Sequence, residues 1–182
     1  MDPAFTHEVA VRAVDRTGAR SDPSASVSVA TLPADTSTFT DSCGDTSELA
    51  AASDTGSLGV DTTNGKYMPH PDGSVDDARL KRTSTGDVAM VYRPGGRVLD
   101  LTVQFHQNAQ HGGTVEYYES TDGGSTWSGV DVVRSVYGPA GSGGWSSSIH
   151  YCPAFSAGVD RVKLVLTGGD VAWSGQVGNV AI

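Results

Sequence analysis

Apolar and polar residues alternate with a period of two along much of the chain. The clearest stretch is 98–107, VLDLTVQFHQ, which places its apolar residues from Leu99 to Phe105 on one face and Asp100, Thr102 and Gln104 on the other. Because successive side chains of a strand point to opposite faces, this alternation predicts a half-buried β-strand. Further strands are expected at 79–84, 87–94, 114–120, 129–136, 146–153, 160–168 and 176–182.

Gly-rich turns separate the expected strands, and no segment has a convincing helical period. Only 46–53, TSELAAAS, could form one short helix. Charged residues make up 18% of the chain and 23 residues are glycine, a composition typical of β-rich proteins with many tight turns. Short strands without alternating helices predict an all-β fold, an antiparallel β-sandwich of jelly-roll type.

The chain is expected to contain a small N-terminal segment and one main domain. Residues 1–6, MDPAFT, are typical of an expression-vector scar, and no signal peptide is expected. Residues 7–32 alternate on either side of a polar turn and predict a β-hairpin. Two strands alone are only marginally stable, so this hairpin should dock on the main domain or on another copy. Residues 33–38 have the composition of a linker, and 39–182 form the main domain.

The net charge of −9 makes some classes of partner improbable. An acidic surface repels the phosphate backbone of nucleic acids and anionic lipids, so neither nucleic acid nor membrane is an expected partner. The sequence also has no apolar run of about 18 residues that could span a membrane. Neutral ligands are compatible with the charge.

Two cysteines, Cys43 and Cys152, lie near opposite ends of the main domain, and neither belongs to a CxxC motif. We expect a disulfide between them, which would restrict the unfolded chain and contribute about 4 kcal/mol. Two buried free thiols are the alternative. A disulfide would also favour a secreted, extracellular protein.

Residues 120–127 read STDGGSTW and match S-x-D-x-G-x-T-W at every fixed position. The string resembles the Asp-box, a hairpin element best known from the propeller blades of sialidases. A propeller needs a repeated four-stranded blade, and the string occurs once here, so a local structural role is expected. Asp122 should accept backbone N–H groups across the turn. Gly123 and Gly124 should supply positive φ angles, and Trp127 should fold over the hairpin.

Aromatic and histidine side chains in loops and at strand ends are the candidate ligand-binding residues. Trp145 lies among Gly and Ser residues, which cannot bury an indole by themselves, so exposure is expected. Tyr118 should point outward, because the neighbouring Tyr117 is assigned to the core face. His106 and His111 lie at a strand end and in a loop, where they could orient a ligand, coordinate a metal or simply be exposed.

Oxygen ligands are concentrated in acidic loops. Asp41 and Asp45 lie in the first loop of the main domain, TDSCGDTSE, and could contribute to a structural Ca²⁺ site, although no EF-hand spacing is present. Solvated acidic turns are the alternative.

Several strings carry a resemblance to modules of bacterial extracellular enzymes. VRAVDRTGARS, within 7–32, resembles the penultimate strand and following loop of a fibronectin type III domain. DARLKRTS, GTVEYYESTDGGSTWS and VAWSGQVGNVAI resemble the C-terminal carbohydrate-binding modules of actinobacterial glycoside hydrolases. This resemblance implies a secreted glycan-degrading enzyme, in which the chain binds a polysaccharide without catalysis beside the catalytic domain.

The acidic charge ranks neutral polysaccharides above uronate-rich ones. Trp145, Tyr118, His106 and His111 are the expected ligand contacts. Two alternatives stay open. One is a purely structural accessory sandwich, and the other is a small jelly-roll polysaccharide lyase, which would need Tyr118, His106 and Arg134 in one groove.

Overall fold

The computed structural model describes residues 6–14, 19–30, 38–63, 75–137 and 143–182. The chain divides into two compact units, Met1–Ser37 and Thr38–Ile182. Strands dominate the described residues and no α-helix occurs among them, so the all-β prediction is confirmed. In these residues no helix is long and apolar enough to cross a membrane. Most of the expected scar and most of the expected linker lie outside the described residues.

The first unit contains the β-hairpin that its alternating sequence predicts. Strands β1 (Thr6–Val9) and β2 (Val27–Ala30) are antiparallel, with Val9 opposite Val27. Ser24 continues the pairing beyond the strands by accepting a hydrogen bond from the backbone N–H of Val11 at 3.0 Å. Docking of this hairpin on a partner surface stays a prediction.

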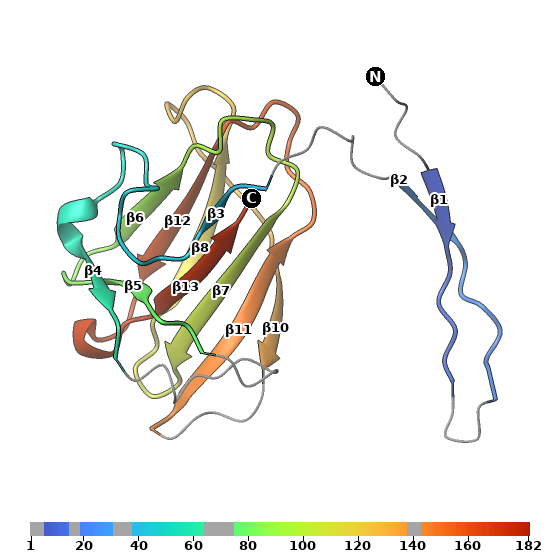
Figure 1. Ribbon diagram of the computed structural model, residues 1–182, viewed down its shortest axis with the longest axis horizontal. Coiled ribbons are helices and arrows are strands. Elements are labelled where there is room, and N and C mark those ends of the chain that lie inside the picture. The colour runs from blue at the N-terminus through green and yellow to red at the C-terminus, as the bar shows by residue number, and fades with distance from the viewer. Residues whose placement is uncertain (1–5, 15–18, 31–37, 64–74, 138–142) are drawn as a thin grey trace. The chain divides into compact units, whose positions relative to one another are not determined.

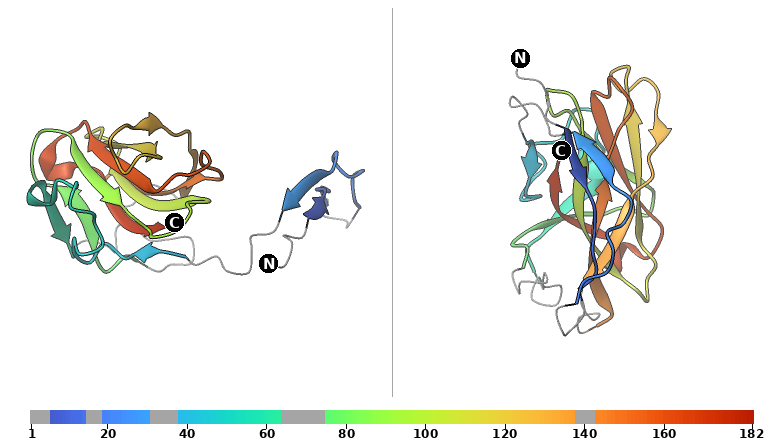
Figure 2. Two further views of the ribbon diagram at one scale, coloured as in Figure 1. Left: turned by 90° about the horizontal axis from the view of Figure 1, so that it is seen from above. Right: turned by 90° about the vertical axis from the view of Figure 1, so that its right-hand side faces the viewer.

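The second unit is an antiparallel β-sandwich of two sheets (Figures 1 and 2). The larger sheet has the order β10-β11-β7-β13-β5-β4, with β3 also paired to β13, and the smaller sheet has the order β6-β12-β8-β9. The larger sheet consists of β3 (Thr40–Asp41), β4 (Leu58–Asp61), β5 (Arg79–Arg82), β7 (Leu101–Asn108), β10 (Val133–Tyr137), β11 (Trp145–Cys152) and β13 (Gln176–Ala181). The smaller sheet consists of β6 (Val88–Tyr92), β8 (Thr114–Ser120), β9 (Ser128–Gly129) and β12 (Arg161–Thr167). Two 3-10 turns, η1 (Thr55–Ser57) and η3 (Val171–Trp173), lie in the connections.

The strands that the alternation predicts in the main domain are present with their ends shifted by a few residues, except for the strand expected at 129–136. That segment is divided between β9 of the smaller sheet and β10 of the larger sheet. In β12, Val162, Leu164 and Leu166 are buried between the sheets, while Arg161 and Lys163 are partly exposed. This inward and outward alternation is what the sequence predicts for a strand with one face on the core. The hydrophobic core is built from such residues of both sheets.

The short helix considered for 46–53 does not form. The backbone N–H of Ala50 donates to the carbonyl of Val91 at 2.8 Å, and that of Asp54 donates to the carbonyl of Ala89 at 2.9 Å. These groups therefore pair with the edge of β6 instead of with one another. Tertiary pairing overrides the helical propensity of the alanines in this segment.

The predicted disulfide is wrong, because Cys43 and Cys152 are both free and buried. Cys43 follows β3 and Cys152 ends β11, and the strands β13 and β7 lie between them in the larger sheet. Three strand spacings amount to about 14 Å, whereas a disulfide requires Cα atoms within about 7 Å. Burial raises the pKa of both thiols, which keeps them protonated.

Candidate functional site

Two connections and the first residue of β11 bring His111, Trp173 and Trp145 together at one end of the sandwich, near the end of β7 (Figure 1). The His111 and Trp173 rings are stacked, with centroids 5.2 Å apart and an interplanar angle of 11°. Trp145 lies 6.3 Å from Trp173 with its ring tilted by 44°. Trp173 is 44% exposed, whereas Trp145 is only 7% exposed. We call these three residues the aromatic platform.

Glycines allow the connections to approach closely enough to form the platform. A Cβ on Gly169 would collide with the backbone oxygen of His111, and a Cβ on Gly113 would collide with the backbone nitrogen of Gly175. Gly169 also has a φ of +68°, which L-residues with a side chain rarely adopt. The β7–β8 connection therefore lies directly against the β12–β13 connection, and this contact places His111 parallel to Trp173.

A buried guanidinium holds the Trp173 connection from beneath. Arg82 is 2% exposed, and its Nη2 donates hydrogen bonds to the carbonyls of Gly168 and Gly169, the latter at 2.6 Å. Asp170 then caps η3 by accepting from the backbone N–H of Ala172 at 2.9 Å. The backbone that leads into Trp173 is thus held in place by hydrogen bonds.

Asn108 fixes the connection that leads into β11. Its Nδ2 donates to the carbonyl of Gly143 at 2.8 Å, and its Oδ1 accepts from the backbone N–H of Gln110 at 3.0 Å. Trp145 lies opposite Asn108 as the first residue of β11. The prediction that Trp145 is exposed is wrong. Its sequence neighbours are small, but Trp173 and the strand pairing cover the indole from elsewhere in the chain.

His106 is completely buried, so the prediction that it contacts a ligand from an exposed strand end is wrong. Strand β7 continues to Asn108, which places His106 within the larger sheet. Its Nε2 lies 2.5 Å from Asp76 Oδ2, and its Nδ1 lies 2.8 Å from Ser147 Oγ. The imidazole therefore serves the packing of the segment around Asp76 against the sheet.

Tyr118 points outward from the smaller sheet, as the alternation predicts, while Tyr117 is buried. Its hydroxyl donates to Glu116 Oε2 at 2.6 Å. The Lys163 ammonium lies 4.7 Å from the Tyr118 ring centroid and 4.3 Å from that of Trp127. Tyr118 therefore belongs to a surface cluster of its own, stabilised by cation–π contacts, and not to the aromatic platform.

The Asp-box hairpin between β8 and β9 makes the hydrogen bonds expected of it. Asp122 Oδ1 accepts from the backbone N–H groups of Ser125 and Thr126, each at 2.9 Å. These and the Thr126 hydroxyl lower the pKa of Asp122 to about 2. Gly123 and Gly124 have φ angles of 73° and 91°, and the Trp127 ring lies over Gly124. The motif thus closes the hairpin between β8 and β9.

The two aspartates expected to contribute to a Ca²⁺ site both accept hydrogen bonds from the protein. Asp41 is buried and accepts hydrogen bonds from the backbone N–H of Cys43 at 2.7 Å and from the Tyr92 hydroxyl at 3.0 Å. Asp45 is exposed and accepts from the backbone N–H of Ser47 at 2.7 Å. In the part of the chain that the structure describes, no three or more His, Cys, Asp or Glu side chains gather as metal ligands. A Ca²⁺ site at Asp41 and Asp45 stays a prediction.

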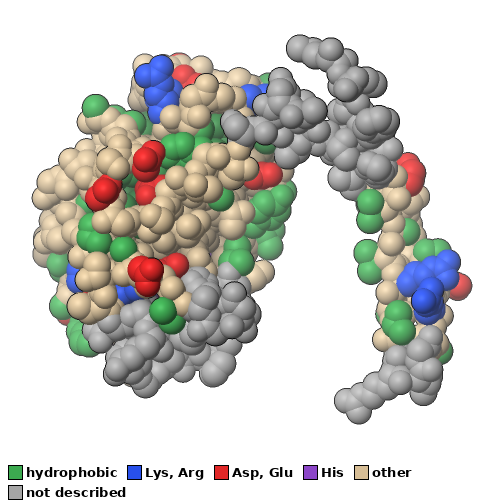
Figure 3. Space-filling view, in the orientation of Figure 1, with side chains coloured by type: hydrophobic (Ala, Val, Ile, Leu, Met, Phe, Trp, Pro, Cys, Tyr) green, Lys and Arg blue, Asp and Glu red, His purple; other side chains and the backbone are tan. Residues whose placement is uncertain are grey.

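The three residues named for the lyase alternative do not share one groove. Tyr118 and Arg134 line the same pocket, but His106 is completely buried in β7 and is not part of that lining. The larger sheet's own outer face carries few charged side chains, and hydrophobic ones gather along its edge over β10 and β11 (Figure 3). Val133 and Tyr151 are the large exposed hydrophobic residues of these two strands.

No protein-family model, curated protein or solved structure matches this chain. The assignment of a function therefore rests on the geometry of the site. Trp173 is not among the ligand contacts expected from the sequence, although it lies in GGDVAWSG, a setting of Gly, Asp and Ser residues similar to that of Trp145. The same compositional signal could have identified it.

Proposed function

We propose that residues 38–182 form a non-catalytic carbohydrate-binding module, which directs a secreted glycan-degrading enzyme to a neutral polysaccharide. The observation that carries this proposal is Trp173, an indole that remains 44% exposed although Trp145, His111 and Arg82 hold its surroundings in place. An exposed aromatic residue held in a fixed position is a feature of binding surfaces, because burying it on a ligand releases water without a large loss of side-chain entropy.

The chemistry around Trp173 suits a sugar ring. The flat indole can contact the apolar C–H face of a pyranose, and the polar groups nearby can bond to its hydroxyls. Gln110 and Asp170 are exposed beside the platform, and His111 is partly exposed within it. The net charge of −9 favours a neutral glycan over a uronate polymer, which the acidic surface would repel.

Affinity electrophoresis through gels that contain mannan, xylan, galactan or arabinan tests the proposal. At least one neutral polysaccharide should retard the protein, and Trp173→Ala should remove most of the retardation. Tyr151→Ala is the matched control, because Tyr151 is 40% exposed on the outer face of the larger sheet, outside the platform. Polygalacturonate serves as the anionic control.

Each alternative has its own outcome in this experiment. Lack of retardation on every gel would favour a purely structural accessory domain. Unsaturated products released from the uronate polymer would favour a lyase. Loss of retardation in Tyr151→Ala but not in Trp173→Ala would move the site to the face of the larger sheet and contradict the proposal for the platform.

A further inference from the structure

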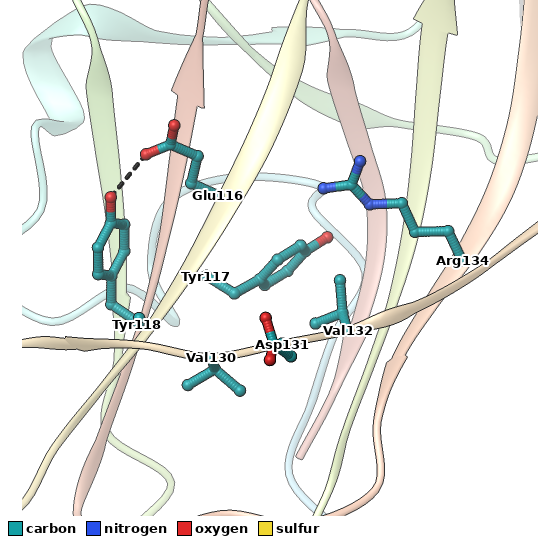
Figure 4. Close-up of a pocket in the computed structure, with 8 residues that line it drawn as sticks. Glu116, Tyr117, Tyr118, Val130, Asp131, Val132 and Arg134 are labelled. Carbon is teal, nitrogen blue, oxygen red and sulfur yellow. Dashed lines mark hydrogen bonds between the residues drawn. The ribbon is translucent and has the colours of Figure 1, made fainter.

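A second polar recess, which shares no residue with the aromatic platform, lies where the edges of the two sheets meet (Figure 4). It is an open pocket of about 430 Å³ between β8 and the segment 129–134, which crosses from β9 to β10. The backbone N–H of Val130 donates to the carbonyl of Tyr117 at 2.9 Å and holds this segment against β8. The lining residues are Glu116, Tyr117, Tyr118, Gly129, Val130, Asp131, Val132 and Arg134.

A buried hydrogen-bond relay fixes the orientation of the Tyr117 hydroxyl. Ser148 Oγ donates to the carbonyl of Phe105 at 3.3 Å, so it accepts from His150 Nε2, which lies 3.0 Å away. His150 Nδ1 is then an acceptor, and Tyr117 donates to it at 2.7 Å. The Tyr117 hydrogen therefore points into the protein, so Tyr117 offers the pocket no hydrogen-bond donor.

The pocket is rich in hydrogen-bond acceptors. Glu116 and Asp131 contribute carboxylates, whereas Tyr117 is almost completely buried and its hydroxyl bonds to His150. The Tyr118 hydroxyl already donates to Glu116, so Arg134 is the one side-chain donor in the lining that has no hydrogen-bond or ion-pair partner among the described residues. Two carboxylates and one guanidinium give a formal charge of −1, while Val130 and Val132 supply an apolar side.

We propose that this pocket binds one neutral, hydroxyl-rich sugar unit. Such a unit brings several O–H donors to the carboxylates, accepts from Arg134 through a ring or hydroxyl oxygen, and places C–H groups against the two valines. The pocket volume falls within the range of small-molecule sites, whereas the platform would engage a sugar ring by its face. The excess negative charge opposes phosphorylated and carboxylated ligands. The unit is either a free monosaccharide or the terminal residue of a glycan chain.

NMR titration of the whole chain with methyl glycosides of glucose, galactose, mannose, xylose and arabinose tests this proposal. One of them should bind with a Kd of about 1 mM and shift the backbone amides of 129–134. Asp131→Asn and Arg134→Gln should each weaken this binding about tenfold by removing a charged hydrogen bond. Both side chains are exposed, so the fold should be retained. Asp77→Asn and Arg97→Gln are exposed controls outside the pocket and should leave the affinity unchanged.

Further comparisons distinguish a free sugar from the end of a glycan chain as the ligand, and distinguish the pocket from the aromatic platform as the binding site. Tighter binding of an oligosaccharide than of its methyl glycoside would identify a chain end as the ligand, and equal affinity would identify a free sugar. Trp173→Ala should not change monosaccharide binding, so failure of the platform and failure of the pocket are distinguishable. Shifts confined to the platform, or no shift with any glycoside, would overturn the proposal.

Discussion

Acidification should destabilise the folded protein through His150, whose imidazole is only 4% exposed within the relay beneath Arg134. Burial, aided by the positive charge of Arg134, lowers the pKa of His150 to about 4, from an ordinary value of 6.5. Between these two pH values the unfolded chain binds a proton at this histidine that the folded chain does not. The unfolded state is therefore favoured increasingly as the pH falls through this window.

The size of the effect follows from the pKa difference. One pKa unit corresponds to about 1.4 kcal/mol. The contribution of His150 to the free energy of unfolding is nearly complete above pH 6.5. It should fall by about 2 kcal/mol between pH 7 and pH 5, and by about 3 kcal/mol down to pH 4, where folded His150 also begins to accept a proton.

Urea unfolding at pH 7, 6 and 5 measures this contribution when wild type is compared with His150→Gln, whose amide does not titrate. The variant loses packing at every pH, so it should be less stable throughout. The difference in the free energy of unfolding between the two proteins should decrease by about 2 kcal/mol from pH 7 to pH 5. The carboxylates titrate in both proteins and cancel in the difference. A gap that stays constant with pH would refute the neutral, buried state of His150.

Three further substitutions or labelling experiments test the architecture. Gly169→Ala should lower the free energy of unfolding in urea by about 1–3 kcal/mol, because Gly169 has a positive φ and the new Cβ would collide with neighbouring backbone. Gly86→Ala is the control, since Gly86 has open space around it. Equal stability of the two variants would contradict the close approach of the connections. Asp122→Ala should lower the thermal unfolding midpoint by removing the hydrogen bonds of the Asp-box turn, and an unchanged midpoint would deny the motif its structural role. Alkylation of the denatured, unreduced chain should label both Cys43 and Cys152 in intact-mass analysis, since both are free. An unlabelled chain would instead show that the two cysteines form a disulfide.

The strands of the main domain could be predicted because one face of each is buried against the opposite sheet. Period-two alternation records that burial directly in the sequence, as Val162, Leu164 and Leu166 illustrate. The Asp-box turn was equally predictable, because Asp122 bonds to residues within the motif itself. The two-residue strand β3 and the four-residue strand β4 were missed, since so few residues carry no readable period.

Properties that depend on distant segments could not be predicted in this way. Trp145 is buried by Trp173 and by pairing with β7, and nothing in its own Gly/Ser-rich surroundings records those contacts. His106 was placed at a strand end, but the strand continues past it and Asp76 covers its ring. The disulfide was predicted from the number of cysteines alone. The strand order, which the sequence does not show, places two strands between Cys43 and Cys152.

Two of the expected ligand contacts, Trp145 and His111, do lie in one cluster, although with altered roles. Trp145 supports the cluster from the interior, and Trp173 takes the exposed position that was expected of Trp145. The close approach that unites them depends on Gly113 and Gly169, whose importance becomes visible only when the two connections are placed together. Loop chemistry alone therefore predicted an exposed tryptophan but placed it at the wrong position.

Isothermal titration of the folded chain with the neutral polysaccharide that retards it most, carried out on wild type and Trp173→Ala, tests the central claim most directly. Removing the exposed indole should cost about 1–3 kcal/mol of binding free energy, or roughly 5- to 150-fold in Kd. The thermal unfolding midpoint should change little, because much of the Trp173 surface is already exposed. Equal affinities of the two proteins, with the fold intact, would contradict carbohydrate binding at the aromatic platform.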